Sequence, residues 1–340
     1  MSQMNNTSDS PISRLSRMLT YNLTQMIYVI VKLGIPDVLA AKSMHVDDLA
    51  ASVKVHPRSL HRVLRALASQ GVFTEESPGH FSQTSLSKLL RSDVPDSLRP
   101  FALSYGEPWW WNAWGNLLHS VQTGETAFDS VHGMGLFEYL NQSPDAASIF
   151  NANMTAMTAQ EGQAVVMAYD FSHIGTLVDV GGGHGELVSA ILQAYPQMHA
   201  VVFDQPSVIE GTRLRLEAAG LDERCEIKGG SFFESIPKGG NIYTLKDILH
   251  DWDDEQAIAI LRNCHRSMST SAKLLIIERI IPPGNDPMIG KLIDISMLVL
   301  TGGRERTEAE YKSLLDAAGF HVTNIFSSNM DSSIIEARRA

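Results

Sequence analysis

From Thr176 onward the sequence alternates between short apolar runs and longer amphipathic segments, and this alternation restricts the fold more than any other feature. The runs that read as strands are 177–180, 199–203, 241–245 and 272–278. The segments between them that read as helices are 185–195, 206–219 and 254–268. Strands that alternate with helices predict a parallel sheet covered on both faces. Two final strand-like runs, 322–326 and 333–337, predict an antiparallel pair at the edge of that sheet.

The first third of the chain follows another pattern. A short helical segment at 46–50 and a longer one at 57–70 precede two strand-like runs, 71–74 and 80–83, joined by a Ser-Pro-Gly turn. Two helices followed by a hairpin are typical of a winged-helix domain. Residues 100–160 read as helical and are rich in tryptophan. We therefore expect a winged-helix domain over 1–105, a helical linker over 106–160 and an α/β domain over 161–340.

Composition excludes several classes of protein. The chain has 340 residues, a formal net charge of −11 and two cysteines, Cys225 and Cys264, so neither a disulfide scaffold nor a Cys-rich zinc site is expected. No apolar run is long enough to span a membrane. The polar segment Met1–Ser10 is expected to be a disordered tail rather than a secretion signal. The low cysteine count fits a reducing cytoplasm, so we expect a cytoplasmic protein. No cluster of acids and histidines has clear metal-ligand spacing, so no metal is expected.

A glycine-rich turn, Asp179–Gly185, lies between the first strand and the helix that follows it. Open parallel sheets bind ligands at this edge, where the strands end. The dinucleotide pattern requires a third glycine three residues after the second, but those positions hold Glu186 and Val188. A dehydrogenase is therefore disfavoured, and no phosphate-binding loop of the Walker type is present. Asp204 ends the second strand, where a carboxylate can accept hydrogen bonds from ribose hydroxyls.

Four motifs occur in one order along the chain. They are the Asp-Val-Gly-Gly-Gly-His-Gly turn at 179–185, Leu-Lys-Asp-Ile-Leu-His-Asp-Trp at 245–252, Gly-Gly-Arg-Glu-Arg-Thr at 302–307 and Ala-Ala-Gly-Phe at 317–320. From about residue 15 to its end, the chain resembles the plant caffeate-type and bacterial acetylserotonin-type small-molecule O-methyltransferases. The resemblance implies a Rossmann-like class I methyltransferase sheet of α/β class and an N-terminal helical winged-helix domain that dimerises. It also implies S-adenosylmethionine (SAM) as methyl donor, a hydroxyl on a small aromatic metabolite as acceptor, and a homodimer.

The resemblance makes His250 the general base, with Glu278 and Glu305 beside it. One of the two acids is expected to hold the far ring nitrogen of His250. The chemistry agrees, because a phenol with a pKa of about 10 is mostly un-ionised at neutral pH, and an imidazole with a pKa of about 6.5 suits removal of its proton.

The remaining site residues also follow from the resemblance. The expected cofactor-binding residues are Asp179, Gly181, Gly183, Asp204, Ser231, Phe232 and Lys246. Ser231 stands where plant members have an acid expected to contact adenine, and Phe232 is expected to pack on the adenine face. The expected acceptor-binding residues are Phe150, Met154, Met157, Asp251 and Trp252. Their apolar character favours a flat aromatic acceptor.

Two alternatives remain open. One is a related enzyme that keeps SAM but methylates nitrogen or carbon, or catalyses another reaction such as hydroxylation. A winged-helix regulator is a second possibility, because Arg58, Arg62 and Arg65 lie on one predicted helix and residues 1–105 carry eleven Lys or Arg against eight acids. Against it, the same helix carries leucines for burial and the whole chain is acidic, so neither nucleic acid nor membrane is an expected partner. The role of Trp109–Trp111 also stays open among pocket, dimer contact and core.

Overall fold

The computed structural model describes residues 10–340. The chain separates into two compact units, residues 1–111 and 112–340. The disordered tail expected at Met1–Ser10 lies outside the described residues except for Ser10, whose hydroxyl caps the first helix by accepting from Ser13 N. Within residues 10–340, no helix is both long and apolar enough to cross a membrane.

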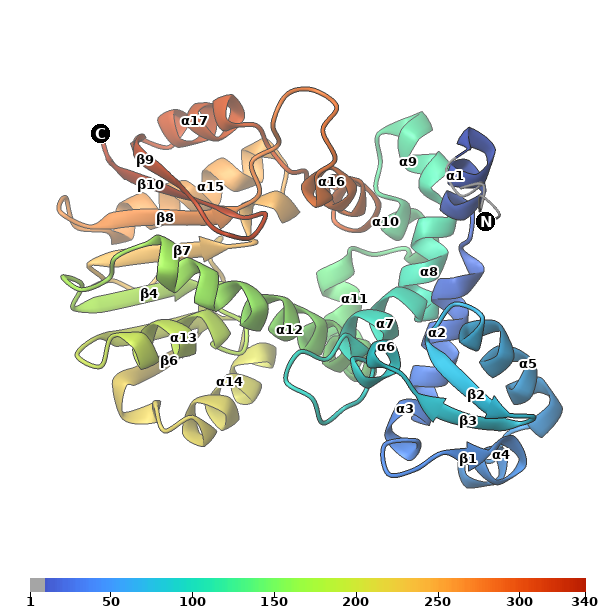
Figure 1. The fold of residues 1–340 in the computed structure, drawn as a ribbon. Helices are drawn as coiled ribbons and strands as arrows, with labels where there is room; N and C mark the ends of the chain where they lie inside the picture. Colours follow the sequence, from blue (N-terminus) through green and yellow to red (C-terminus); the bar gives the residue numbers. More distant parts are fainter. Residues whose placement is uncertain (1–9) are drawn as a thin grey trace, which may run out of the picture. The chain divides into compact units, whose positions relative to one another are not determined.

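The first unit has the helices and hairpin of a winged-helix domain (Figure 1). Its helix α5 begins at Pro57, where the missing N–H costs nothing, and buries Leu60, Leu64 and Leu67 on one face. The hairpin strands β2 and β3 pair antiparallel, and a two-residue strand, β1, pairs with β3. The elements are α1 (Pro11–Met18), α2 (Asn22–Lys32), α3 (Ile35–Val38), β1 (Met44–His45), α4 (Val46–Val53), α5 (Pro57–Ala68), β2 (Phe73–Ser77), β3 (His80–Gln83), α6 (Ser85–Lys88) and α7 (Arg99–Gly106).

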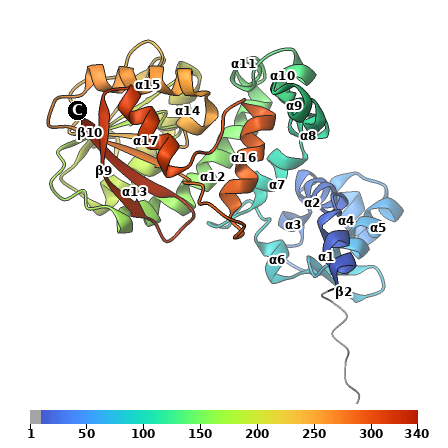
Figure 2. The same cartoon turned by 90° about the horizontal axis from the view of Figure 1, so that it is seen from above.

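The second unit is built on a seven-stranded sheet in the order β6-β5-β4-β7-β8-β10-β9 (Figure 1). Figure 2 shows this sheet from above, with β9 and β10 toward the viewer. The first five strands of that order are parallel, and β10 is antiparallel to both β8 and β9. This confirms the expected α/β class with a parallel sheet. The strands are β4 (Thr176–Val180), β5 (His199–Asp204), β6 (Cys225–Gly229), β7 (Ile242–Lys246), β8 (Lys273–Glu278), β9 (Phe320–Ser327) and β10 (Ser333–Arg339).

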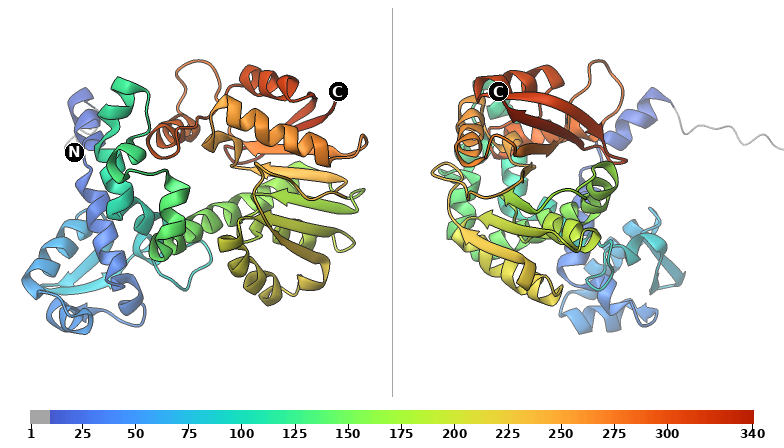
Figure 3. Two further views of the ribbon diagram at one scale, coloured as in Figure 1. Left: turned by 180° about the vertical axis from the view of Figure 1, so that it is seen from behind. Right: turned by 90° about the vertical axis from the view of Figure 1, so that its left-hand side faces the viewer.

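Helices cover both faces of this sheet (Figure 3). Successive strand residues point to opposite faces, so Leu177 packs with α12, α13 and α14, whereas Val178 packs with α15 and α17. The helices that complete the second unit are α9 (Leu117–Thr123), α10 (Ala127–His132), α11 (Leu136–Gln142), α12 (Pro144–Ala168), α13 (Glu186–Ala194), α14 (Pro206–Ala218), α15 (Asp254–Ser267), α16 (Ile289–Leu300) and α17 (Glu308–Ala317), with short 3-10 turns at Asp222–Arg224 and Leu249–Asp251. Helix α8 (Pro108–Gly115) spans the boundary between the units.

The structure adds two elements to those expected from the sequence. Strand β6 comes before β7 along the chain, so β7 is the fourth strand of the sheet, and helix α16 is the second added element. The final strand pair confirms the expected antiparallel edge, in which β10 pairs with β8 and β9 is outermost. The parallel strands β4, β5, β7 and β8 end at one edge of the sheet, where they place Asp179, Asp204, Lys246 and Glu278 of the predicted site.

The start of α17 gives a direct test of local structure. Thr307 Oγ1 accepts from Glu310 N, and the Glu310 carboxylate accepts in return from Thr307 N at 2.8 Å. We expect Thr307→Ala to lower the free energy of unfolding by about 1 kcal/mol, because it leaves helix donors without a partner. Urea unfolding measures this loss. Thr307→Ser keeps the hydroxyl and should stay close to the parent, so equal losses in both variants would contradict the capping role.

Candidate active site

A cavity of about 780 Å³ lies within the second unit at the carboxyl ends of the parallel strands. One wall is formed by the glycine-rich turn and the residues that end β5 and β7. The opposite wall is formed by residues of α11 and α12 and by Trp252. Cavities of this size hold small-molecule ligands.

The glycine-rich turn is possible only without side chains. Gly181 has φ +72°, and a Cβ there would lie 2.3 Å from Ile248 Cδ1. A Cβ on Gly182 would lie 2.8 Å from a carboxylate oxygen of Asp179. The backbone of this turn therefore forms the cavity wall itself, so that a ligand can approach it closely.

A buried carboxylate, that of Asp179, and a half-buried one, that of Asp204, flank this turn. Asp204 Oδ2 accepts from Gly183 N at 2.8 Å, and its Oδ1 accepts from Gln205 N at 2.6 Å. Asp179 Oδ1 accepts from Thr244 Oγ1 at 2.6 Å. Burial raises the pKa of Asp179 to about 6 and also raises the pKa of Asp204. Each lines the cavity and offers oxygens to hydroxyl or ammonium donors.

Six of the seven residues predicted to bind the cofactor line the cavity: Asp179, Gly181, Gly183, Asp204, Phe232 and Lys246. Ser231 is not among the lining residues, and its hydroxyl instead accepts from Phe233 N at 3.3 Å. The residues that line the cavity fit SAM. Carboxylates can accept hydrogen bonds from ribose hydroxyls and an ammonium group, and Phe232 offers an apolar face on which an adenine ring can pack.

Lys246 lies in a cluster of buried ion pairs. Its ammonium is 2.7 Å from Glu161 Oε2 and also contacts the Asp247 carboxylate. Arg279 completes the cluster by donating to Glu161 at 2.6 Å and to Asp247 at 2.9 Å. Burial lowers the pKa of Lys246, but Asp247 and Glu161 raise it overall, so the ammonium stays charged. Its charge is therefore already balanced by protein acids.

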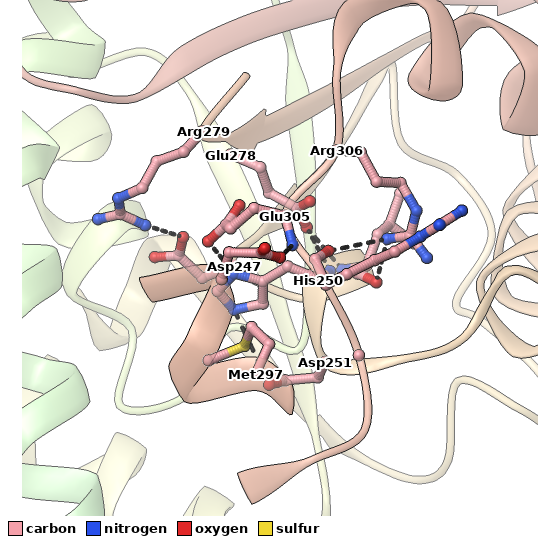
Figure 4. Close-up of polar contacts among 12 residues, drawn as sticks. Asp247, His250, Asp251, Glu278, Arg279, Met297, Glu305 and Arg306 are labelled. Atoms are coloured by element: carbon pink, nitrogen blue, oxygen red, sulfur yellow. Dashed lines mark hydrogen bonds and ion pairs between the residues drawn. The ribbon is translucent and has the colours of Figure 1, made fainter. Parts of the chain in front are cut away.

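His250 is held beside this cavity by Glu305. The His250 Nδ1 atom is 2.9 Å from Glu305 Oε1, and its Nε2 is 3.9 Å from Asp251 Oδ1 (Figure 4). Its side chain is 8 % exposed. Burial lowers the pKa of His250, but Glu305, Asp251 and Asp247 outweigh that effect and raise the pKa to about 10. The Glu305 contact fixes the ring and leaves Nε2 as the nitrogen available for proton transfer.

Glu278 binds the backbone of the same loop. Its Oε1 accepts from the N–H groups of Ile248 at 3.0 Å, Leu249 at 2.6 Å and His250 at 3.4 Å. Its Oε2 accepts from the Tyr311 hydroxyl. Of the two acids expected beside His250, Glu305 therefore holds the ring nitrogen, and Glu278 holds the peptide groups that carry the ring.

Arg306 and Gly303 hold this loop from the other side. The buried guanidinium of Arg306 donates to Leu249 O and Trp252 O, each at 2.8 Å (Figure 4). A Cβ on Gly303 would lie 1.9 Å from His250 O, so only glycine lets the two backbones meet. The loop that carries His250 is thus bound through its donors by Glu278 and through its acceptors by Arg306.

The five residues predicted to bind the acceptor all line the cavity: Phe150, Met154, Met157, Asp251 and Trp252. Phe137 joins them, and its ring stacks on Trp252 with centroids 5.6 Å apart. Burial raises the pKa of Asp251 to about 7. His250, Glu278 and Glu305 are not among the lining residues, but Asp251, which does line the cavity, lies 3.9 Å from His250 Nε2.

Sequence reasoning missed Glu161, Asp247, Arg279 and Arg306. Arg306 lies inside the motif at 302–307, but the motif gives no sign that this side chain is buried. Charged residues are mostly exposed, and one sequence gives no sign of which arginine is enclosed by partners. Asp247 has φ +51°, a left-handed backbone conformation. Aspartate adopts this conformation more often than most residues, but too rarely for the sequence to predict it here.

Comparisons with known proteins agree with this geometry. The model of the O-methyltransferase domain matches residues 114–321, and that of the O-methyltransferase dimerisation domain matches residues 15–93. Phenazine O-methyltransferase PhzM of Lysobacter antibioticus is 45% identical over 340 residues, covering 99% of both chains. Mitomycin biosynthesis 6-O-methyltransferase of Streptomyces lavendulae is 39% identical, covering 87% of this chain and 85% of its own.

Solved structures give the same result. The crystal structure of LaPhzM matches with a TM-score of 0.95 and 46% identity, covering 97% of this chain and 100% of that one. Some relatives have names that specify nitrogen as the acceptor, such as phenazine-1-carboxylate N-methyltransferase of Pseudomonas aeruginosa, which is 31% identical. A buried His–Glu pair, a glycine-rich turn and two matching domains together place this chain in the O-methyltransferase family with a dimerisation domain, and it is a methyltransferase.

Proposed function

We propose that this enzyme transfers a methyl group from SAM to a hydroxyl oxygen of a small aromatic metabolite, with His250 as general base. The observation that carries the proposal is the buried His250–Glu305 pair next to a cavity with aromatic walls. Asp179, Asp204 and Phe232 are the residues proposed to hold SAM, with the backbone of the glycine-rich turn.

The proposed chemistry needs one proton acceptor. When bound, SAM supplies a methyl group on a sulfonium sulfur, which keeps the electrons of the broken carbon–sulfur bond. His250 Nε2 takes the proton of the acceptor hydroxyl while the hydroxyl oxygen forms the new bond to the methyl carbon. Glu305 orients the ring and stabilises the imidazolium that results. We propose that Glu278 contributes by positioning the loop.

The protonation state of His250 links the two substrates. With its pKa raised to about 10, the ring holds a proton at neutral pH before ligands bind. A cationic ligand in the neighbouring cavity disfavours a second positive charge and lowers that pKa. SAM binding is therefore expected to favour the neutral ring, which is the form that accepts a proton.

Nitrogen methylation is the second candidate, since some relatives carry N-methyltransferase names. An amine attacks through its lone pair and has less need of a base before attack, so the oriented imidazole favours oxygen. A regulatory DNA-binding role has weaker support, because α5 buries its leucines and His61 is paired with Glu75 at 3.3 Å. A gel shift that loses binding in salt would be needed to support it.

The match to a dimerisation domain leads us to propose a homodimer. Helix α1 agrees with this, because Ile12, Leu15 and Met18 are exposed apolar residues in the described chain. We also propose that the winged-helix domain ends at residue 105, that the helical linker ends at residue 160 and that the protein is cytoplasmic.

The first test asks which atom is methylated. We expect isotope-labelled methyl from SAM to appear on hydroxyphenazine but not on the matching aminophenazine, and turnover to persist in EDTA because no step needs a metal. Mass spectrometry of the products measures both. Labelled aminophenazine with unlabelled hydroxyphenazine would instead support nitrogen methylation, and loss of turnover in EDTA would contradict the metal-free mechanism.

The second test removes the base. His250→Ala should lower kcat by at least about 100-fold, since general bases contribute on the order of 100- to 10,000-fold. SAM binding, measured by calorimetry, should be retained and should not weaken, because His250 is not among the cavity-lining residues and its removal takes away a positive charge near a cationic ligand. Tyr169→Phe, which removes a buried hydroxyl that donates to Glu336 and does not line the cavity, is a control for general loss of packing. Undiminished turnover in His250→Ala would refute the assigned role.

The third test uses pH. A general base works when deprotonated, so kcat/KM should rise as pH increases through the pKa of His250 in the free enzyme. Glu305 is the carboxylate that raises this pKa most, so Glu305→Gln should shift the rising limb to lower pH and lower the plateau. Glu308→Gln, which removes an exposed carboxylate paired with Lys312, should leave the limb in place. If the limb in Glu305→Gln coincides with the parent limb, the pairing does not set the pKa.

A further inference from the structure

We propose, on the basis of the function above, that the acceptor is a hydroxy-aromatic molecule without a carboxylate or other fixed negative charge. The observation behind this is the distribution of charge around the cavity. Its acceptor side offers no basic side chain among the described residues, and the cations at its other walls are already paired with protein acids.

The absence of basic residues extends along the sequence. No lysine or arginine occurs between Arg99 and Arg213, whereas eleven acids do. This stretch contains α11, α12 and the glycine-rich turn, which together form most of the cavity wall. Burial and Arg215 lower the pKa of His184, the one histidine of that wall among the described residues, so it is neutral. An anionic group that entered against α11 and α12 would find no counter-charge.

Within residues 10–340, the basic side chains that line the cavity are Arg215 and Lys246. Arg215 is ion-paired with Glu186, and Lys246 with Glu161 and Asp247. The imidazole of His250 is likewise balanced, because Glu305 and Asp251 flank its two nitrogens. None of these cations has a net positive charge left to offer an acceptor carboxylate.

Acids exceed bases around the same space. The acidic residues that line it are Asp179, Glu186, Asp204, Glu210, Asp247 and Asp251. A carboxylate placed among them would lose its hydration and be repelled, and both effects are strong where water is excluded. SAM carries two positive groups and one negative group, so the same field favours the methyl donor. The cavity therefore selects a cationic donor and an uncharged acceptor.

Calorimetry on the full chain saturated with S-adenosylhomocysteine tests this. The probes are 6-hydroxyphenazine-1-carboxylic acid and its methyl ester, which share one ring system and differ in charge. We expect the ester to bind at least about tenfold more tightly at pH 8, because only the acid is anionic there. An acid that binds as tightly as the ester, or more tightly, overturns the proposal.

A charge introduced into the wall gives a matched test. Met157 lines the cavity on α12, and lysine and glutamine resemble methionine in length. We expect Met157→Lys to bind the acid about tenfold more tightly than Met157→Gln does, while the ester binds both alike. Equal binding of the acid to the two variants contradicts the proposal. The charge preference is measured by binding and needs no turnover. Failure of O-methylation in the product assay above therefore leaves this preference testable, so the two proposals can fail separately.

Discussion

The site depends on one buried carboxylate, that of Glu278, which accepts hydrogen bonds from three successive peptide groups. A buried charge is costly unless strong donors satisfy it, and here Tyr311 and the loop N–H groups do so. Arg306 supplies the complementary half by donating to two carbonyls of the same loop. The position of His250 is therefore determined by the end of β8 and by the segment before α17, which are distant in sequence and meet only in the folded sheet.

Much of this arrangement could be predicted from the sequence because its signals are local. Alternating apolar runs identified β4, β5, β7 and β8. Strand β6 escaped because Glu226 and Lys228 give it a polar appearance, and α16 escaped because Ile289–Leu300 is apolar around most of its circumference and lacks periodicity. The insertion of β10 between β8 and β9 depends on long-range pairing, which no local pattern specifies. The resemblance predicted both Glu278 and Glu305 beside His250. Only the three-dimensional structure shows that Glu305 contacts the ring and that Glu278 accepts from the backbone of the loop.

Charge is organised in layers around the cavity. Asp247, an acid that lines the cavity, is matched by Lys246 in the same wall and by Arg279, and both cations also bind Glu161 of α12. Buried ion pairs contribute little net stability, because removing charges from water offsets most of their attraction. They do fix orientation, since each partner has few alternative counter-ions. The cluster therefore sets where the acceptor-side helix lies against the sheet edge.

The tightly held loop also bears on how the enzyme must move. A base whose peptide groups are bound on both sides cannot swing toward an arriving molecule, and the contact of Gly303 with His250 O removes the remaining space for adjustment. The ion-pair cluster holds α12, whereas α11 meets the loop through the apolar stacking of Phe137 on Trp252. We therefore expect a planar ring system to be admitted by displacement of α11, with the imidazole as the stationary reference against which that helix moves.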